Sequence, residues 1–441
     1  MLNFEIKFKF YLFTALIFIL KVLIYNKVLF VLFLFLYSFV IIPKNYSQSL
    51  NNPKSDFYFA TLEYATGKTA AANFNFPETN PQQSFSVSLG KTNSNPELIW
   101  NRKLNFPKTG FQLSYADLGN PEKLGYVVSF MPFIDFKIFG TFTNRLNLKT
   151  GLGISYFNKI YDPNFNEFNK AISTHFTWSF KSFVYYSFLV KPNYNLKLGV
   201  DYFHNSNGHV KLPNQGLNSF LIALSSDFNL KNSQIINYEN QNIDNKSVSN
   251  TYFSSRFGYG IRAFSKNENT QKNVCTFSAS AGKILNNTFK FGVGFYYRQY
   301  QDYYDYLKND KQKSYNFFPK LNSKPFLNAS NFGISTNAEI TMNHIGVEVE
   351  FGINFFKPAY EIDWILNEGK YQNGIYNDGE LTSYYKLKKL ISSRLGLKYY
   401  ILNTNKIQKN NFFIACHINA NLGQADFSEL SIGYVRVLNK K

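Results

Sequence analysis

A period of two in its apolar residues is the feature of this sequence that most restricts its fold. From about residue 57 onward, apolar and polar residues alternate over segments that are separated by turn-forming residues. Such alternation is typical of β-strands with one apolar and one polar face. It predicts a first series of about eight strands, at 57–66, 82–91, 109–117, 124–143, 147–158, 171–191, 194–205 and 216–228. A second series of about eight is predicted at 252–265, 274–285, 287–300, 331–342, 344–357, 388–402, 411–422 and 427–438.

The composition favours one large β architecture over several soluble domains. Aromatic residues make up 19% of the chain and charged residues only 17%, and the mean hydropathy is −0.25. This hydropathy excludes a helical membrane bundle, whereas a transmembrane β-barrel hides its apolar face in alternation. A sheet edge cannot stay open in lipid, because unpaired backbone amides find no water there. We therefore expect an all-β fold, a transmembrane antiparallel β-barrel of about 14–16 strands in one barrel; the alternative is an eight-stranded barrel plus a second β unit.

Two apolar runs, at 11–20 and 28–42, set the N-terminus apart from the rest of the chain. Lysines flank both runs, and small polar residues follow the second. This pattern predicts a signal peptide within 1–48 and export by the Sec route, with a retained helical anchor as the alternative. The expected organisation after it is a first barrel region at 49–228, a polar loop or linker at 229–251, and a C-terminal strand region at 252–441 that completes the barrel.

One hairpin concentrates the residues that can carry chemistry. Residues 196–224 read LKLGVDYFHNSNGHVKLPNQGLNSFLIAL, which is two alternating limbs joined by a turn rich in Gly, Pro and Asn. His204, Ser206 and Asn218 fall on the apolar face of their limbs, at the end next to the turn. The hairpin therefore brings a hydroxyl, an imidazole and an amide to one place.

These are the residue types of a serine hydrolase. A serine hydroxyl becomes a good nucleophile when an adjacent imidazole takes its proton, and the imidazole needs a third group that fixes its tautomer. We expect Ser206 to be the nucleophile, His204 the general base and Asn218 the orienting group. Backbone amides at Asn207 and Gly208, or the Asn207 side chain, are expected to hold the oxyanion. The competing interpretation is an ordinary solvated turn, for which an NSNG sequence alone is common.

The motif HNSNGHVKLPNQGLN resembles the signature H-x-S-N-G-(x)4-P-N-x-G of the lipid A 3-O-deacylase family, the PagL-like enzymes that are called acyloxyacyl hydrolases in Bacteroidetes-type bacteria. The resemblance covers about 124–228. It implies a bacterial outer-membrane barrel that hydrolyses a carboxylic ester of lipid A, with His204 as base, Ser206 as nucleophile and Asn207 near the oxyanion. Its site loop then includes Pro213, Asn214 and Gly216.

Asn218 departs from the resemblance, because the best-known members of that family have a glutamate there. An asparagine still orients a histidine in Cys-His-Asn sites. It does not stabilise the imidazolium with a full charge. An ester hydrolase is therefore expected, with a binding-only descendant as one alternative.

The placement of this trio on the apolar face has a consequence for the substrate. The apolar face of a membrane barrel contacts lipid, so the site is expected on the outer wall near the membrane boundary, where an ester among acyl chains reaches it. The expected partners are lipid A or lipopolysaccharide in the outer leaflet, and the membrane. The net charge of +19 fits either a basic rim facing this anionic glycolipid or solvated lysine-rich loops. Because the lysines form no stripe with stacking aromatics, a nucleic acid is not an expected partner.

No metal or organic cofactor is expected. Cys275 and Cys416 lie far apart in strand-like segments and outside any metal-ligand spacing, so they either pair or stay free. His175 is expected to be a strand histidine satisfied by a neighbour, and His209 a solvated loop residue or a contact for lipid phosphate. Besides binding without catalysis, the remaining alternative is a porin-like barrel with a wide, charged lumen.

Overall fold

The computed structural model describes residues 57–138, 145–191, 194–230, 248–266, 269–309, 318–367, 370–372, 375–377 and 382–438. The signal peptide predicted within 1–48, and residues 231–247 of the predicted polar segment, lie outside these ranges. Lys54–Lys441 forms one compact unit. In the described part of the chain, helices are too short or too polar to span a membrane.

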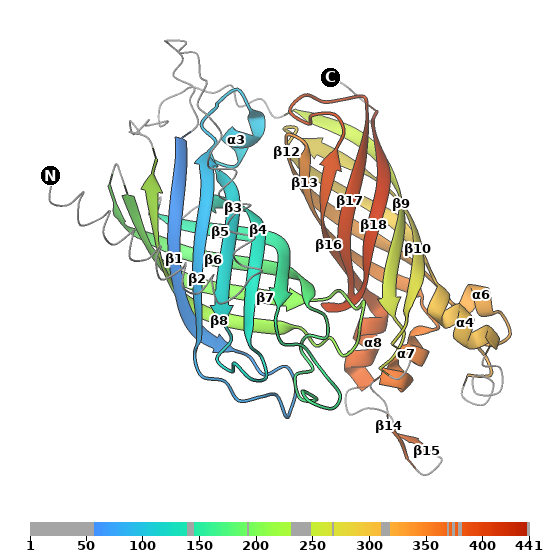
Figure 1. The fold of residues 1–441 in the computed structure, drawn as a ribbon. Helices are drawn as coiled ribbons and strands as arrows, with labels where there is room; N and C mark the ends of the chain where they lie inside the picture. Colours follow the sequence, from blue (N-terminus) through green and yellow to red (C-terminus); the bar gives the residue numbers. More distant parts are fainter. Residues whose placement is uncertain are drawn as a thin grey trace. The chain divides into compact units, whose positions relative to one another are not determined.

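The first half of the chain closes into an antiparallel β-barrel (Figure 1). Its strands follow one another in sequence order, and the last strand pairs back with the first, for example at Tyr64 opposite Leu224. The strands are β1 (Phe57–Thr69), β2 (Gln82–Thr92), β3 (Lys108–Asp117), β4 (Tyr126–Lys137), β5 (Leu146–Phe157), β6 (Phe176–Val190), β7 (Tyr194–Ser206) and β8 (Leu217–Asn229).

The second half closes into a barrel of its own. Its last strand pairs with its first, for example at Ile432 opposite Phe257. The strands are β9 (Ser249–Ala263), β10 (Gln271–Leu285), β11 (Phe289–Tyr300), β12 (Ser330–Met342), β13 (Ile345–Phe356), β16 (Ile391–Tyr400), β17 (Asn410–Asn421) and β18 (Gln424–Val437).

The all-β, antiparallel barrel fold is as predicted, but the single barrel of about 14–16 strands that the alternation favours does not form. The arrangement is the alternative one, in which an eight-stranded barrel is followed by a second β unit. The reason is that β8 satisfies the free edge of β1, and β18 satisfies that of β9, so neither set leaves an open edge for the other. The C-terminal strands thus complete a second barrel, not the first.

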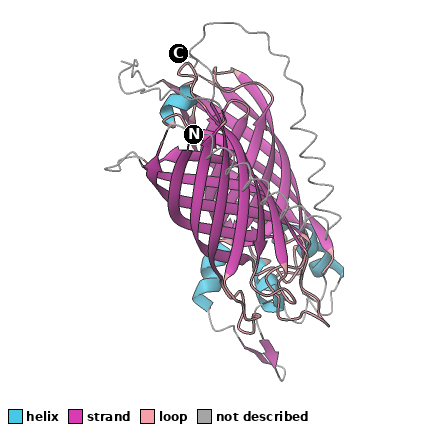
Figure 2. Ribbon diagram, turned by 60° about the vertical axis from the view of Figure 1, so that its left-hand side comes forward, coloured by secondary structure: helices cyan, strands magenta, loops and turns pink. Residues whose placement is uncertain are grey.

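Short helices lie at the ends of the strands, as Figure 2 shows. One of these helices replaces part of a predicted strand. A strand was expected at 388–402, but residues 388–390 are the last residues of a helix. Lys388 and Lys389 stand in its last turn, where cations favour the helix dipole. The helices are α3 (Ile99–Lys103), α4 (Gln301–Asn309), α6 (Pro325–Asn328), α7 (Tyr360–Asn367) and α8 (Thr382–Leu390), and a small hairpin joins β14 (Lys370–Gln372) to β15 (Ile375–Asn377).

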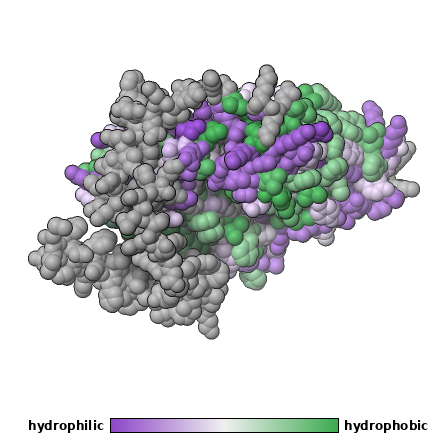
Figure 3. All heavy atoms as spheres, turned by 90° about the horizontal axis from the view of Figure 1, so that it is seen from above, coloured by the Kyte–Doolittle hydropathy of each residue, from purple (hydrophilic) through white to green (hydrophobic). Residues whose placement is uncertain are grey.

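The outer walls are apolar and the lumens are polar. Leu198 and Val200 of β7 are 50% and 60% exposed on the outside, whereas Lys197 and Asp201, which flank them, point inward and are buried. Figure 3 shows hydrophobic and hydrophilic residues gathered in separate areas of the described surface. This division is that of a membrane barrel, whose lipid-facing and lumen-facing residues alternate.

Ion pairs fill both lumens. In the first barrel, Lys181 lies 3.0 Å from Asp201 and also bonds Glu63, and a second lysine, Lys197, lies 2.7 Å from Asp227. The second barrel has a matching network, in which Lys398 and Arg394 share one glutamate, at 2.5 and 2.8 Å, and each bonds one further glutamate, at 2.9 and 2.7 Å. An eight-stranded barrel is just wide enough for its own side chains. These side chains therefore occupy the space that a pore would need.

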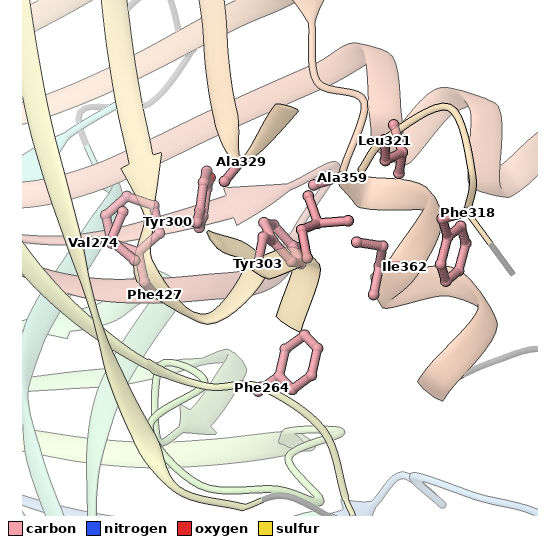
Figure 4. Packing of buried hydrophobic residues seen from close by; sticks show 11 residues of the cluster. Phe264, Val274, Tyr300, Tyr303, Phe318, Leu321, Ala329, Ala359, Ile362 and Phe427 are labelled. Atoms are coloured by element: carbon pink, nitrogen blue, oxygen red, sulfur yellow. The ribbon is translucent and has the colours of Figure 1, made fainter. Parts of the chain in front are cut away.

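Helices cap one end of the second barrel. Figure 4 shows aromatic residues of the barrel, among them Tyr300 and Phe427, packed next to Tyr303 of α4 and Ile362 of α7. Arg262 of β9 ties this cap together through three carboxylates. They are Asp302 at 2.9 Å, Asp363 at 2.7 Å and Asp426 at 2.6 Å.

Candidate active site

The β7–β8 hairpin brings the predicted base and its orienting group face to face. His204 and Asn218 are direct cross-strand partners. Their side chains meet on the outer wall, where His204 Nδ1 lies 2.8 Å from Asn218 Oδ1. The register follows from the alternation of the two strands, because a slip of either strand by one residue would turn its outward side chains into the lumen.

A second hydrogen bond at Asn218 settles which nitrogen of His204 carries the proton. Tyr202, two residues before the histidine, donates its hydroxyl to Asn218 Oδ1 at 2.7 Å. Since this oxygen is an acceptor, His204 Nδ1 is the donor of the other bond. The Nε2 atom then bears the free lone pair that a general base needs. The sequence interpretation missed Tyr202, although its alternation places it on the same face.

Ser206 lies one outward position beyond His204 and is 6% exposed. Its Oγ accepts hydrogen bonds from the side-chain amide of Asn214 at 2.9 Å and from the backbone N–H of Gly208 at 3.2 Å. Among the described residues, no hydrogen bond joins Ser206 to His204. A base and its nucleophile are often further apart in a free enzyme than in the substrate complex.

The loop between the two strands, residues 207–216, is called the site loop below. Asn207 braces it, because its side-chain amide donates to Lys211 O at 2.7 Å and to Ser173 Oγ at 3.0 Å. Its own backbone N–H is 3.1 Å from Asn214 Oδ1, and this bond fixes the Asn214 side chain next to Ser206. The Asn207 side chain is thus engaged within the protein, and the donors that point at Ser206 come from Gly208 and Asn214.

Gly216 and Pro213 shape the far side of the site loop. Gly216 has a φ of +76°, and a Cβ there would lie 3.1 Å from His204 Cε1. Its backbone N–H donates to Ala171 O at 3.1 Å, which ties the loop to the segment between β5 and β6. Pro213 follows a cis peptide bond. A side chain at 216 would therefore press on the base and strain the backbone.

The position on the outer wall agrees with the alternation. Phe220 and Ile222 of β8 and Leu198 and Val200 of β7 are all exposed and continue the stripe on which the site stands. The site occupies the end of this stripe next to the site loop. The site is therefore approached from the apolar outer wall of the barrel.

The other histidines of this region have structural surroundings. His175 Nδ1 lies 2.7 Å from Phe157 O, and its ring stacks on Tyr156. His209 is not the solvated residue that was expected, because it is only 6% exposed. Burial, and next the positive charge of Arg262, lower the pKa of His209 to about 4.

Neither cysteine is in a disulfide: Cys275 and Cys416 are both free. In the described ranges, no group of His, Cys, Asp and Glu side chains is arranged to hold a metal ion.

Comparison with known proteins gives one family match. Residues 92–226 match the model of the family described as lipid A 3-O-deacylase (PagL). A search of curated proteins finds no match. Among solved structures, the outer membrane enzyme PagL matches with 16% identity and a TM-score of 0.26, over 37% of this chain and 97% of that one. An outer membrane channel from Pseudomonas putida F1 matches with 9% identity and a TM-score of 0.17, over 90% of this chain and all of that one.

The family match covers the strands β3 to β7, the site loop and most of β8, and so it includes His204, Ser206 and Asn218. The match falls within the closed eight-stranded barrel of the first half of the chain. Residues 92–226, within the first barrel, thus match the model of the lipid A 3-O-deacylase (PagL) family.

Proposed function

We propose that this protein is an outer-membrane serine esterase that removes an ester-linked acyl chain from lipid A. The observation that carries the proposal is the His204–Asn218 pair on the lipid-facing wall, with Ser206 next to it under two hydrogen-bond donors. A soluble substrate would not be concentrated at a lipid-facing wall. Lipid A, in contrast, would have its ester bonds in the membrane next to that wall.

The first half of the reaction forms an acyl-enzyme. Ser206 turns its hydroxyl toward His204 and attacks the ester carbonyl, while its proton passes to His204 Nε2. Asn218 Oδ1 accepts from Nδ1–H and holds the imidazole in place. The carbonyl oxygen becomes an oxyanion, for which Gly208 N–H and the Asn214 side chain are the nearest donors. The intermediate expels the sugar oxygen, which takes the proton from Nε2.

Water completes the cycle. It attacks the acyl-enzyme carbonyl and gives a proton to His204 Nε2, and Ser206 leaves with that proton as the fatty acid is released. Exposed lysines on the neighbouring loops, Lys123, Lys159 and Lys211, offer positive charge to the phosphates of lipid A. The loop end of the first barrel is therefore suited to an anionic glycolipid.

A porin function has less support. Buried ion pairs and tyrosines occupy the two lumens. A binding barrel without activity would share the same surface, so it has to be separated from an esterase by experiment.

The decisive experiment is mass spectrometry of lipid A from cells that express either the wild type or Ser206→Ala, at equal outer-membrane levels. We expect the wild type to remove the mass of one hydroxyacyl chain, and the variant to lose activity by about a thousandfold or more. Full activity in Ser206→Ala would contradict the serine mechanism. Unchanged lipid A with both proteins would favour binding without catalysis.

A further inference from the structure

The site loop is held by residues of the second barrel as well as by its own. His209 O accepts a hydrogen bond from Ala263 N at 2.8 Å, at the end of β9. Gly208 O accepts one from Ser428 Oγ at 3.4 Å, near the start of β18. Both barrels belong to the same compact unit, Lys54–Lys441. Gly208 and His209, which follow Ser206 and Asn207, are thus hydrogen-bonded to strands that are distant in the sequence.

Ser428 is linked to the surroundings of Ser206, the proposed nucleophile, through Trp178. It accepts a hydrogen bond from Trp178 Nε1 at 3.2 Å, and Trp178 is the cross-strand partner of Ser206. A Cβ on Gly208 would lie 2.1 Å from Ser428 Oγ and 3.4 Å from Trp178 Cδ1. Gly208 therefore fills a narrow gap between the two barrels, and its N–H is the one that reaches Ser206.

A third contact fixes the other limb of the site loop. The side chain of Asn269 accepts from Leu212 N at 2.8 Å and donates to Leu212 O at 2.5 Å. One amide side chain thereby satisfies both backbone groups of the residue before Pro213. Gln271 adds a bond to Val210 O at 3.3 Å. The backbone from 208 to 212 is consequently pinned at each end by the second barrel.

From these contacts we propose that the second barrel is a working part of the active site, with Ser428 and Asn269 as positioning residues for ester hydrolysis. The proposal rests on the proposed esterase function. Neither residue touches the ester. Ser428 acts through Gly208, whose N–H is an oxyanion donor, and Asn269 acts through the loop backbone that carries Asn214 to Ser206. Donors placed before the reaction stabilise the transition state more than donors that must move.

The test uses the full-length chain in detergent with lipopolysaccharide as substrate. The variants are Ser428→Ala, Asn269→Ala and the double variant. Asn405→Ala is the matched control, because its side chain bonds Asn343 at 2.7 Å in turns at the opposite end of the same barrel. We expect the double variant to lower kcat by about tenfold or more with KM changed less than about twofold, since only transition-state contacts are disturbed. Ser428→Thr, which keeps the hydroxyl, is expected to restore kcat relative to Ser428→Ala.

Assembly of each variant is checked by the heat-dependent shift of folded barrels in gel electrophoresis. A well-assembled double variant with wild-type kcat would overturn the proposal, as would an equal loss in Asn405→Ala. If the double variant fails to assemble, the comparison of Ser428→Ala with Ser428→Thr decides in its place, and equal kcat values for those two would also overturn it.

A second readout separates this proposal from the proposed function. A fluorophosphonate probe labels an activated serine without any lipid substrate. Slower labelling of Ser206 in the Ser428 and Asn269 variants than in Asn405→Ala supports the positioning role even if lipid A is not the substrate. Labelling at the wild-type rate contradicts it. A wild-type protein whose labelling is unaffected by Ser206→Ala would instead refute the serine esterase.

Discussion

One oxygen atom, Asn218 Oδ1, holds the candidate base His204 in its orientation. Asn218 Oδ1 accepts from both Tyr202 and His204, and so both of its lone pairs are used. In the family resemblance a carboxylate stands at this position. A carboxylate presents an oxygen to the histidine in either orientation, whereas an amide can present its nitrogen instead. The hydrogen bond from the Tyr202 hydroxyl keeps the amide oxygen of Asn218 facing His204.

Asn218→Glu is expected to keep kcat unchanged or raise it up to about tenfold. A full negative charge beside the imidazolium adds on the order of 1 kcal/mol of stabilisation when His204 holds the proton. The measurement is the rate of fatty acid release from lipopolysaccharide by the purified variant. Complete loss of activity in an assembled barrel would show that Asn218 has a different task.

Tyr202→Phe is expected to lower kcat about fivefold, the effect of one lost hydrogen bond. The barrel itself should assemble normally, because Tyr202 lies on the outer wall. Tyr194→Phe, on the same strand but at its other end, is the control and should leave kcat unchanged. Equal rates for the two variants would remove Tyr202 from the site.

The site loop contains His209, a residue that is expected to make the stability of the protein depend on pH. His209 has a φ of +70° and is buried against groups from three elements of the second barrel: Arg262 of β9, Asp363 of α7 and Asp426 of β18. Its pKa is lowered to about 4 from an ordinary value of 6.5, first by burial and next by Arg262. The histidine is therefore neutral in the folded protein at neutral pH.

The sign of the resulting pH dependence follows from linkage. Between pH 6.5 and about 4 the unfolded chain binds the His209 proton and the folded protein does not. Stability from this residue is thus fully present above pH 6.5 and falls as the pH falls through that window. His209→Asn, which tolerates the positive φ, is expected to lose this part of the pH dependence of Tm. Identical Tm profiles for wild type and variant between pH 4 and 7 would contradict the assignment.

At the scale of elements, what the sequence predicts well is local. The strand expected at 82–91 is β2 at Gln82–Thr92, because alternation alone defines it. The positions of His204, Ser206 and Asn218 on one outer face follow from the same alternation. The role of Asn214 does not, since its side chain reaches Ser206 only through the fold of the site loop. Ser428 was beyond local reasoning altogether, because it comes from another barrel.

At the scale of the whole molecule, local sequence patterns do not determine which strands pair to close each sheet into a barrel. Each strand carries an apolar face whichever neighbour it has, and a single large barrel would satisfy the same alternation. The choice depends on which distant strands pair, such as β1 with β8. The polar lumen residues reflect the outcome, since their lysines and carboxylates are matched within each barrel.

The lumen of the first barrel predicts a large stability effect. Lys181→Met leaves Glu63 and Asp201 buried without their shared cation, and removal of one partner from a buried ion network costs about 3–5 kcal/mol. The free energy of unfolding in urea, measured in detergent, should fall by this amount. Lys283→Met is the control, because that lysine is exposed and in no ion pair among the described residues. Equal unfolding free energies would mean that the lumen network contributes little.

The double closure also bears on how the polypeptide assembles. A cylinder whose last strand meets its first is finished, and nothing in its hydrogen bonding calls for more chain. Here that point is reached at β8, and about half of the chain follows it. The polypeptide therefore has to close two rings, one where β8 meets β1 and one where β18 meets β9, and the two rings stay joined by a single covalent connection.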